Sequence, residues 1–462
     1  MTRRGLILSA LAASSAALAA SRGGVASAFS PSPPPLRLRA PGAASPRSPL
    51  PPLRASSEEA AAGGVEGGGG GGGGPNPLAS LFSSLLNAGG SAPAETEEER
   101  ARRLKMERYE QISASEVRRA ARVREDAIPY LSLLAIQFLP LLGSERNLSV
   151  AYFWVLACAT VYVGGRQETI DEPEVVSKQS AMYAPLGASA SILLLYVLIQ
   201  NGLDPGALYA VIVVLFGAIS ISDVGVPILR GLLPESFAEA EVDVPAPLAK
   251  RLDLDPPTLP LDGLVALAVG LSCAAAYWAP GIGMEDKFLV SNFLAWALGM
   301  TSLAAISLGS FQTGALLLLG LFCYDIFWVF GTDVMMTVAT KVEAPIKFLF
   351  TAPPSDVPRS YPFSVLGLGD VVIPGLFVSF MATLDRELKP KNVSYFQAGT
   401  AAYAVGLGLC FVVNEITHAG QPALLYLDPA CVGTALACAK ANGQLDEVWN
   451  FEEGRPQVAD KA

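Results

Sequence analysis

Hydrophobic residues in this chain gather in long uninterrupted runs, which begin near residue 127 and continue to residue 438. The runs are 15 to 25 residues long, and several can cross a hydrocarbon layer of about 30 Å. They lack the period-two alternation of a transmembrane barrel, so each run is predicted to be a helix. The ten runs cover residues 127–143, 148–164, 182–200, 205–221, 262–280, 288–309, 312–336, 361–384, 395–414 and 421–438.

This pattern predicts an all-α fold, a polytopic membrane helix bundle with nine or ten transmembrane helices. The first run contains Pro129 and Pro140 and could instead lie at the membrane interface, which would leave nine helices. The largest connection within the membrane part is expected at residues 222–261. Lys and Arg occur in loops on both sides, so the positive-inside rule does not fix the orientation.

The first 57 residues have the composition of a targeting leader. Residues 1–28 are predicted to be a signal peptide, because two arginines precede an apolar run and a small-residue Ala-Ser-Ala site ends it; the alternative is a membrane anchor. Residues 29–57 are rich in Ser, Pro and Arg and contain no acidic residue, which is typical of a transit peptide. The two-part leader resembles those of algae with secondary plastids. We therefore expect a plastid membrane, with the endoplasmic reticulum or another secretory membrane as the alternative.

Residues 58–126 are predicted to form a linker and a charged helix. An uninterrupted glycine tract at residues 67–74 loses too much backbone entropy on ordering and is expected to be flexible. Residues 95–126 hold nine acidic and nine basic side chains and are predicted to form a solvated helix. The multi-span domain is assigned to residues 127–440 and a polar tail to residues 441–462.

Composition supports the membrane assignment and excludes several classes of function. Only 16% of residues are charged and 51% are hydrophobic, whereas roughly a quarter of a soluble domain is charged. A net charge of −10 without a basic, aromatic-rich patch argues against a nucleic-acid partner. The six cysteines have no CxxC spacing and are predicted to pack rather than bind zinc. The single histidine, His418, excludes an HExxH metalloprotease, and neither a metal nor an organic cofactor is predicted.

Two aspartates stand out within the apolar runs. Residues 288–340 contain only Asp325 and Asp333 as charged side chains, and residues 361–384 contain only Asp370. An ionisable group at the centre of a membrane helix costs about 2.5–3.5 kcal/mol on insertion scales, so it marks a candidate functional site. Asp333 lies near the end of its segment and is assigned a structural role.

The spacing predicts that Asp325 and Asp370 lie at a similar depth. Asp325 lies 11 residues before the expected helix end near Met336, or about 16 Å, and Asp370 lies 9 residues after the expected start near Tyr361, or about 14 Å. Two carboxyl groups that share a site can hold one proton between them. An aspartic protease uses such a pair to activate water and to protonate the peptide carbonyl oxygen. A proton-coupled transporter could use the same pair, and the chemistry alone does not choose between them.

Three motifs resolve this choice. They are Tyr324-Asp325, the Gly367-Leu368-Gly369-Asp370 string, and Pro422-Ala423-Leu424 at the start of the last span. This order of YD, GxGD and PAL motifs resembles the intramembrane aspartic proteases of the signal peptide peptidase and presenilin class, over about residues 148–455. The FWVFGT string at residues 327–332 and the QPALLYL string at residues 421–427 are similar to the signal peptide peptidase branch, and so is the short separation of the aspartates.

The resemblance implies a presenilin-like fold, catalysis by Asp325 and Asp370, and cleavage of transmembrane peptides of type II orientation, such as signal peptides. It also implies activity in the lipid bilayer without partner subunits, while a homo-oligomer stays open. The residues expected to support the site or bind substrate are Tyr324, Gly367, Gly369, Pro422, Ala423 and Leu424.

These support roles have physical reasons and alternatives. Gly367 and Gly369 would let a substrate or a facing helix approach Asp370, or serve helix packing alone. Tyr324 either offers its hydroxyl to the site or packs. Pro422 lacks an N–H, so residues 421–424 are expected to stay unwound, where their backbone groups can pair with an extended substrate.

Three further polar residues are expected to lie outside the chemistry or at its margin. Glu415 and His418 are expected at the membrane interface, and a serine mechanism through His418 would leave the paired aspartates unexplained. Asp428 stands where the resembling family carries an apolar residue, and it is expected to reach the interface or to face an aqueous cavity.

Overall fold

The computed structural model describes residues 114–167, 173–203, 205–238, 240–247, 258–281, 283–352, 361–417 and 420–453, together with Arg100 and Arg103. The chain divides into two units, one of which is residues 29–108. The description below concerns residues 114–453 of the other unit. The predicted leader, glycine linker, His418 and the end of the polar tail lie outside the described residues.

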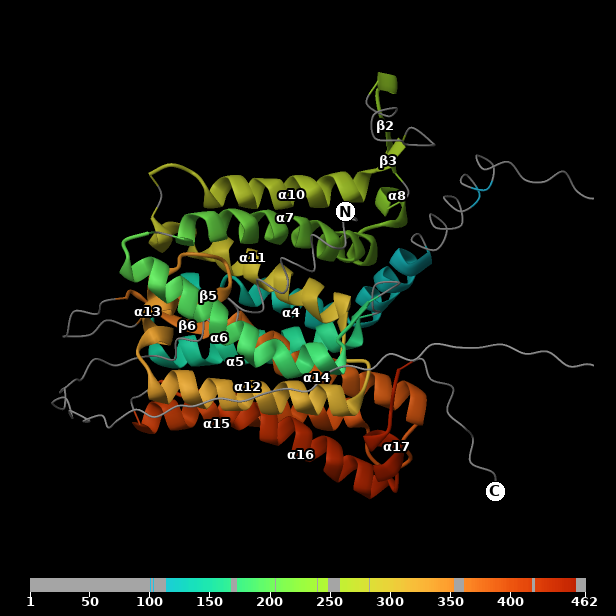
Figure 1. Ribbon diagram of the computed structural model, residues 1–462. Helices are drawn as coiled ribbons and strands as arrows, with labels where there is room; N and C mark the ends of the chain where they lie inside the picture. The colour runs from blue at the N-terminus through green and yellow to red at the C-terminus, as the bar shows by residue number, and fades with distance from the viewer. Residues whose placement is uncertain are drawn as a thin grey trace, which may run out of the picture. The chain divides into compact units, whose positions relative to one another are not determined.

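Long helices run side by side through this unit (Figure 1). Within the described ranges, eight helices are long and apolar enough to cross a membrane, and a ninth, α10, has 17 residues. The predicted all-α polytopic membrane bundle is therefore confirmed. The nine helices are α5 (Arg146–Arg166), α6 (Lys178–Gln200), α7 (Pro205–Leu232), α10 (Leu261–Tyr277), α11 (Met284–Ala305), α12 (Phe311–Gly331), α14 (Leu368–Leu388), α15 (Tyr395–Thr417) and α16 (Leu424–Asn442).

Shorter elements connect these helices. The first apolar run forms two pieces, because Pro140 cannot continue an α-helix and lies within a short 3-10 turn. The whole stretch Ala127–Leu141, including the two residues between the pieces, is 15 residues long, fewer than a straight span needs. The short elements are α4 (Ala127–Ile136), η1 (Leu139–Leu141), α8 (Glu235–Ala238), α13 (Val334–Lys341), α17 (Leu445–Trp449), β1 (Glu174–Val175), β2 (Glu241–Asp243), β3 (Thr258–Pro260), β4 (Ile306–Ser307), β5 (Lys347–Thr351) and β6 (Phe363–Gly367).

Three boundaries predicted from hydrophobicity are wrong. Helix α7 extends to Leu232, well into the predicted loop at 222–261, because its charged residues in that part are paired with neighbouring helices. The run at 312–336 breaks after Gly331, where Thr332 is extended and a separate helix, α13, follows. The run at 361–384 begins as strand β6, and its helix starts only at Leu368.

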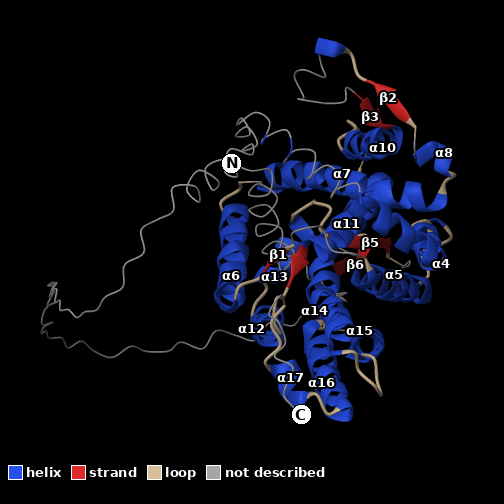
Figure 2. Ribbon diagram, turned by 90° about the vertical axis from the view of Figure 1, so that its right-hand side faces the viewer, coloured by secondary structure: helices blue, strands red, loops and turns tan. Residues whose placement is uncertain are grey.

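Strands β5 and β6 form an antiparallel hairpin that lies among α5, α11 and α14 (Figure 2). Lys347 pairs with Gly367 at one end, and Thr351 pairs with Phe363 at the other. Most residues of both strands are buried. Buried backbone N–H and C=O groups require partners, and the ladder supplies them for a segment that is not helical.

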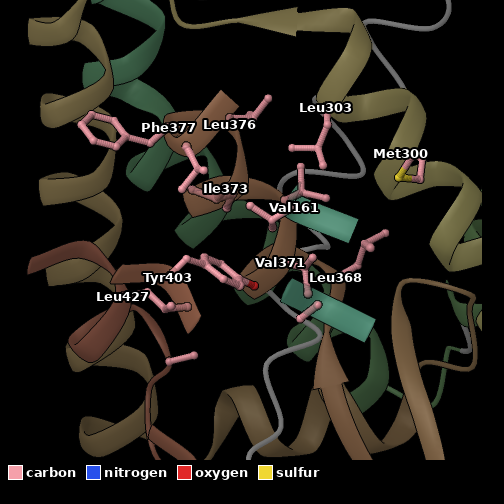
Figure 3. Close-up of a cluster of buried hydrophobic side chains, with 14 of the residues drawn as sticks. Val161, Met300, Leu303, Leu368, Val371, Ile373, Leu376, Phe377, Tyr403 and Leu427 are labelled. Carbon is pink, nitrogen blue, oxygen red and sulfur yellow. The ribbon is translucent and has the colours of Figure 1, made fainter. Parts of the chain in front are cut away.

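Helix α14 is the central helix of the bundle. In the most apolar 18-residue stretch of α14, 83% is buried inside the protein, whereas only 11% of the equivalent stretch of α6 is buried. Figure 3 shows its apolar side chains Val371, Ile373, Leu376 and Phe377 packed among residues of other helices. A helix enclosed by protein can carry a carboxyl group that a lipid-facing helix would exclude.

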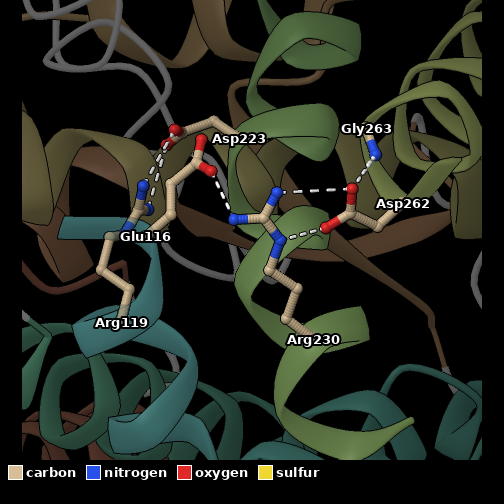
Figure 4. A network of polar contacts seen from close by, with 6 residues as sticks. All are labelled: Glu116, Arg119, Asp223, Arg230, Asp262 and Gly263. Atoms are coloured by element: carbon tan, nitrogen blue, oxygen red, sulfur yellow. Dashed lines mark hydrogen bonds and ion pairs between the residues drawn. The ribbon is translucent and has the colours of Figure 1, made fainter. Parts of the chain in front are cut away.

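The described part of the charged segment, residues 114–125, is a helix as predicted, but it is solvated on one face only. This helix docks on the end of α7 (Figure 4). Arg119 donates two hydrogen bonds to the Asp223 carboxylate, at 3.2 and 3.4 Å. Glu116 accepts from Arg230, and the same guanidinium pairs with Asp262. Opposite charges in the membrane helices explain why one face of this helix is held against them.

The docking is close as well as polar. A Cβ atom added at Gly231 would lie 2.7 Å from Cβ of Val123, so the absent side chain lets the two helices touch. Asp262 is fully buried, and its second oxygen accepts from the Gly263 backbone N–H at 2.7 Å. The network thus joins the charged helix, α7 and α10 through side chains that are mostly withdrawn from water.

Candidate functional site

Asp325 lies in the second half of α12 and is fully buried. Its Oδ2 accepts a hydrogen bond from the backbone N–H of Leu424, at 3.2 Å. Leu424 is the first residue of α16, and the amides of a first helical turn have no partner within the helix. The YD and PAL motifs, which are 99 residues apart in the chain, therefore meet directly.

The PAL segment has the predicted irregular start. Residues 421–423 are not helical, as expected from Pro422, whereas Leu424 already belongs to α16. The side chain of Gln421 accepts a hydrogen bond from the Tyr426 hydroxyl at 3.0 Å. This contact ties the non-helical stretch to the first turn of α16.

Asp370 lies in the first turn of α14. The expected nine-residue helical approach from Tyr361 is wrong, because Phe363–Gly367 pairs with β5 as a strand. Asp325 lies only 6 residues before the end of α12 at Gly331, or about 9 Å along a helix. Both aspartates are thus nearer to helix ends than the sequence predicts.

The helices that carry the two aspartates share a neighbour. Helices α12 and α14 both pack against α16, and α14 also packs against α15. The hydroxyl of Tyr403, on α15, donates to the backbone C=O of Asp370 at 3.4 Å. Figure 3 shows Tyr403 beside Val371 and Leu427. Helix α15 packs against α14 and α16, so it borders the GxGD and PAL motifs.

The remaining predicted support residues lie at these junctions. Tyr324 is buried, and its ring lies 6.3 Å from that of Trp328. Trp328 donates its indole N–H to Ser189 of α6 at 3.0 Å. Gly367 ends β6, and Gly369 is buried in the first turn of α14. All three predicted support residues therefore flank the two aspartates in the chain and are withdrawn from solvent.

The other acidic residues have distinct surroundings. Glu415 is exposed and pairs with Arg146 at 2.8 Å, which fits the expected contact with water. Asp333 precedes α13, and its backbone C=O accepts from Thr337, in line with a structural role. Asp428 is 4% exposed, so it faces the protein interior rather than the membrane surface.

Sequence reasoning missed Lys347, a buried cation in β5. Its ammonium donates to the backbone C=O groups of Ala339 and Val342 at the end of α13, the latter at 3.2 Å, and lies 5.0 Å from the Tyr361 ring centroid. A cation at a helix C-terminus is favourable. Burial nevertheless lowers the pKa of Lys347 to about 8. The charge of Glu343 opposes this effect and only partly offsets it.

This pKa predicts a specific pH dependence of stability. Between pH 8 and 10.5 the unfolded chain binds more protons at Lys347 than the folded protein, so stability should rise with pH relative to a Lys347→Met variant. The gain is at most about 3.5 kcal/mol, at roughly 1.4 kcal/mol per pKa unit. Thermal unfolding of both proteins in detergent measures it. A difference in Tm that stays constant through this window would contradict the assignment.

Comparison with known proteins identifies the family. The family model described as signal peptide peptidase matches residues 168–455. Signal peptide peptidase of Homo sapiens is 32% identical over 339 residues, which cover 72% of this chain and 85% of the relative. Intramembrane protease 2 of Caenorhabditis elegans is 38% identical over 189 residues, which cover 37% of this chain and 40% of the relative. No solved structure matches the chain.

These relatives are proteases by name, and none of the findings supports the transporter alternative. The match agrees with the resemblance seen in the YD, GxGD and PAL motifs, all of which lie within residues 168–455. With its long apolar helices, the chain is a multi-pass membrane protein that belongs to the signal peptide peptidase family of intramembrane proteases.

Proposed function

We propose that this protease is of the aspartic type and that Asp325 and Asp370 are its catalytic pair. The observation that carries the proposal is the hydrogen bond that the PAL motif donates to the Asp325 carboxylate. The helices of both aspartates, α12 and α14, pack against α16, which begins with this motif. A buried pair of carboxyl groups that shares a proton can supply both an acid and a base.

The proposed reaction uses these two groups in turn. The ionised aspartate takes a proton from water as the water oxygen attacks the peptide carbonyl carbon, while the protonated aspartate donates to the carbonyl oxygen. As the tetrahedral intermediate collapses and the C–N bond breaks, the aspartate that took a proton from water gives it to the leaving nitrogen, and the other aspartate takes a proton back from a hydroxyl of the intermediate. Both aspartates thereby return to their starting states, and one water molecule is consumed.

The hairpin offers a place for an extended substrate beside Asp370. Leu368 N–H donates to Ile346 C=O at one end of the ladder, and Ala352 N–H donates to Pro362 C=O at the other. Alternation along an antiparallel pair then directs the backbone groups of Val365 away from β5. A substrate strand that pairs there would run toward the first turn of α14.

The substrate class and location follow from likeness. The human relative is named signal peptide peptidase, and we propose that this chain also cleaves type II transmembrane segments such as signal peptides. Pro422 and the residues after it would bind the unwound segment. The two-part leader supports a plastid membrane, with a secretory membrane as the alternative. We also propose that the protein is active without partner subunits, either as a single chain or as a homo-oligomer.

Mass spectrometry of a type II membrane peptide incubated with the detergent-purified full chain tests the proposal. In H2(18)O we expect fragments cut within the apolar segment, with one heavy oxygen in each new carboxyl terminus. A hydroxyethylene peptide that mimics the tetrahedral intermediate should block the reaction, whereas reagents against serine and cysteine should not. Intact peptide across several type II substrates, with folded protein present, would refute the proposed function.

A further inference from the structure

Asn292 of α11 is fully buried and lies against strand β5. Its Oδ1 accepts a hydrogen bond from the Leu349 backbone N–H at 2.8 Å, and its Nδ2 donates to the Leu349 backbone C=O at 2.8 Å. One carboxamide thus makes both contacts that a residue of a neighbouring strand would make. The edge of β5 that faces away from β6 is occupied at Leu349 by this side chain.

A third contact connects the same carboxamide to α5. Nδ2 also donates to the Tyr152 hydroxyl at 2.9 Å. Tyr152 is fully buried, and its ring centroid lies 5.4 Å from that of Phe350 in β5. Asn292 therefore joins α5, α11 and β5 at a point where three elements meet. A buried amide with three hydrogen bonds is held in one orientation.

The hairpin connects Leu349 to the helix of Asp370. Leu349 lies opposite Val365, and β6 continues through Gly367 into α14, where Asp370 lies in the first turn. A one-residue slip of a strand would turn every side chain to the opposite face. Anchoring Leu349 on one edge and the β6 ladder on the other fixes the hairpin against the helices.

We propose that Asn292 is a positioning residue for proteolysis, which sets the register of the β5–β6 hairpin and thereby the place where the catalytic aspartates meet the substrate bond. This inference rests on the proposed aspartic mechanism. Its distinctive consequence is that loss of the carboxamide changes which peptide bond is cut, in addition to the rate. A residue that only fills and stabilises the core would leave the cut bond unchanged.

The test uses the full chain in detergent and a type II peptide whose cut bonds are mapped by mass spectrometry. Asn292→Leu keeps the number of side-chain heavy atoms and the branching at Cγ, and removes all three hydrogen bonds. Misplacement of reacting groups by about 1 Å costs on the order of 10²-fold in rate, so we expect kcat to fall about 10²-fold, KM to stay within about threefold, and the cut to spread to neighbouring bonds. Tyr152→Phe is the matched control, because it leaves both Leu349 contacts in place, and it should cut at the wild-type bond.

A second measurement keeps the inference falsifiable apart from activity. Hydrogen exchange of β5 peptides should become faster in Asn292→Leu than in Tyr152→Phe, since the Leu349 amide loses its acceptor. If Asn292→Leu does not fold, Asn292→Ala replaces it, because this variant also removes all three hydrogen bonds. Unchanged cut bonds, or unchanged exchange in β5, would overturn the inference. Failure of the proposed function has a different signature, in which wild type cuts nothing or Asp370→Asn still cuts, whatever the exchange shows.

Discussion

Replacing Asp325 or Asp370 by Asn should lower kcat/KM for a type II peptide by at least about 10³-fold, and replacing both should cost little more. The physical reason is that the two carboxyl groups act as one acid–base pair, so removal of either member removes the whole device. Asn is nearly isosteric with Asp but cannot exchange a proton. Both variants should therefore fold, as gel filtration and thermal unfolding in detergent can check.

Asp333→Asn is the matched control for this experiment. Asp333 lies 8 residues from Asp325 in the chain, outside α12 and before α13. Its replacement should leave kcat/KM within about threefold, since surface substitutions away from the site have small effects. The pair would be wrongly assigned if the losses of the two single variants multiplied in the double variant, or if either single variant kept a tenth of wild-type activity.

Arg230→Met should destabilise the protein by about 3–5 kcal/mol, because it leaves the carboxylate of Asp262 buried without its cation. The Asp262 side chain is fully withdrawn from solvent, and the Arg230 side chain is 16% exposed. Replacing both partners, as Arg230→Met with Asp262→Leu, should restore most of the loss, because no buried charge is then left alone. Thermal unfolding in detergent measures all three proteins.

Arg122→Met provides the comparison on the same charged helix. Arg122 pairs with Glu125 one turn away, and both side chains are well exposed, at 37% and 62%. Exposed pairs of this kind contribute at most about 0.5 kcal/mol. Equal losses from Arg122→Met and Arg230→Met would show that the buried network on α7 and α10 does not hold the helix. The Arg122, Arg230 and Asp262 variants should all still cleave substrate below their unfolding temperatures.

The sequence predicts the helix bundle and the two aspartates, but not the strand that precedes Asp370. Asp325 and Asp370 could be found because a charge inside an apolar run is costly and therefore conspicuous. Strand β6 could not, because a short buried apolar run has no period that separates strand from helix. For the same reason the predicted depth of Asp370 is counted from a strand. The predicted depth of Asp325 is counted from Met336, which belongs to the separate helix α13.

Two other features cannot be recognised from the residues around them in the sequence. Asn292 carries no charge, so it does not stand out in its run, although its three hydrogen bonds reach α5 and β5. The docking of the charged helix could not be predicted, because Asp223, the partner of Arg119, lies 104 residues away in the chain. Pairings across such separations depend on tertiary structure and cannot be read from spacing.

The contact between Leu424 and Asp325 also determines which sequence changes this motif can accept. The donor is a main-chain amide, so no side-chain replacement removes it except proline, which has no N–H. The Leu424 side chain itself is fully buried, and its replacements are limited by volume rather than by hydrogen bonding. At this position the motif requires a side chain of suitable volume, whereas the hydrogen bond comes from the backbone. Another apolar residue of similar size at position 424 would therefore keep the hydrogen bond to Asp325.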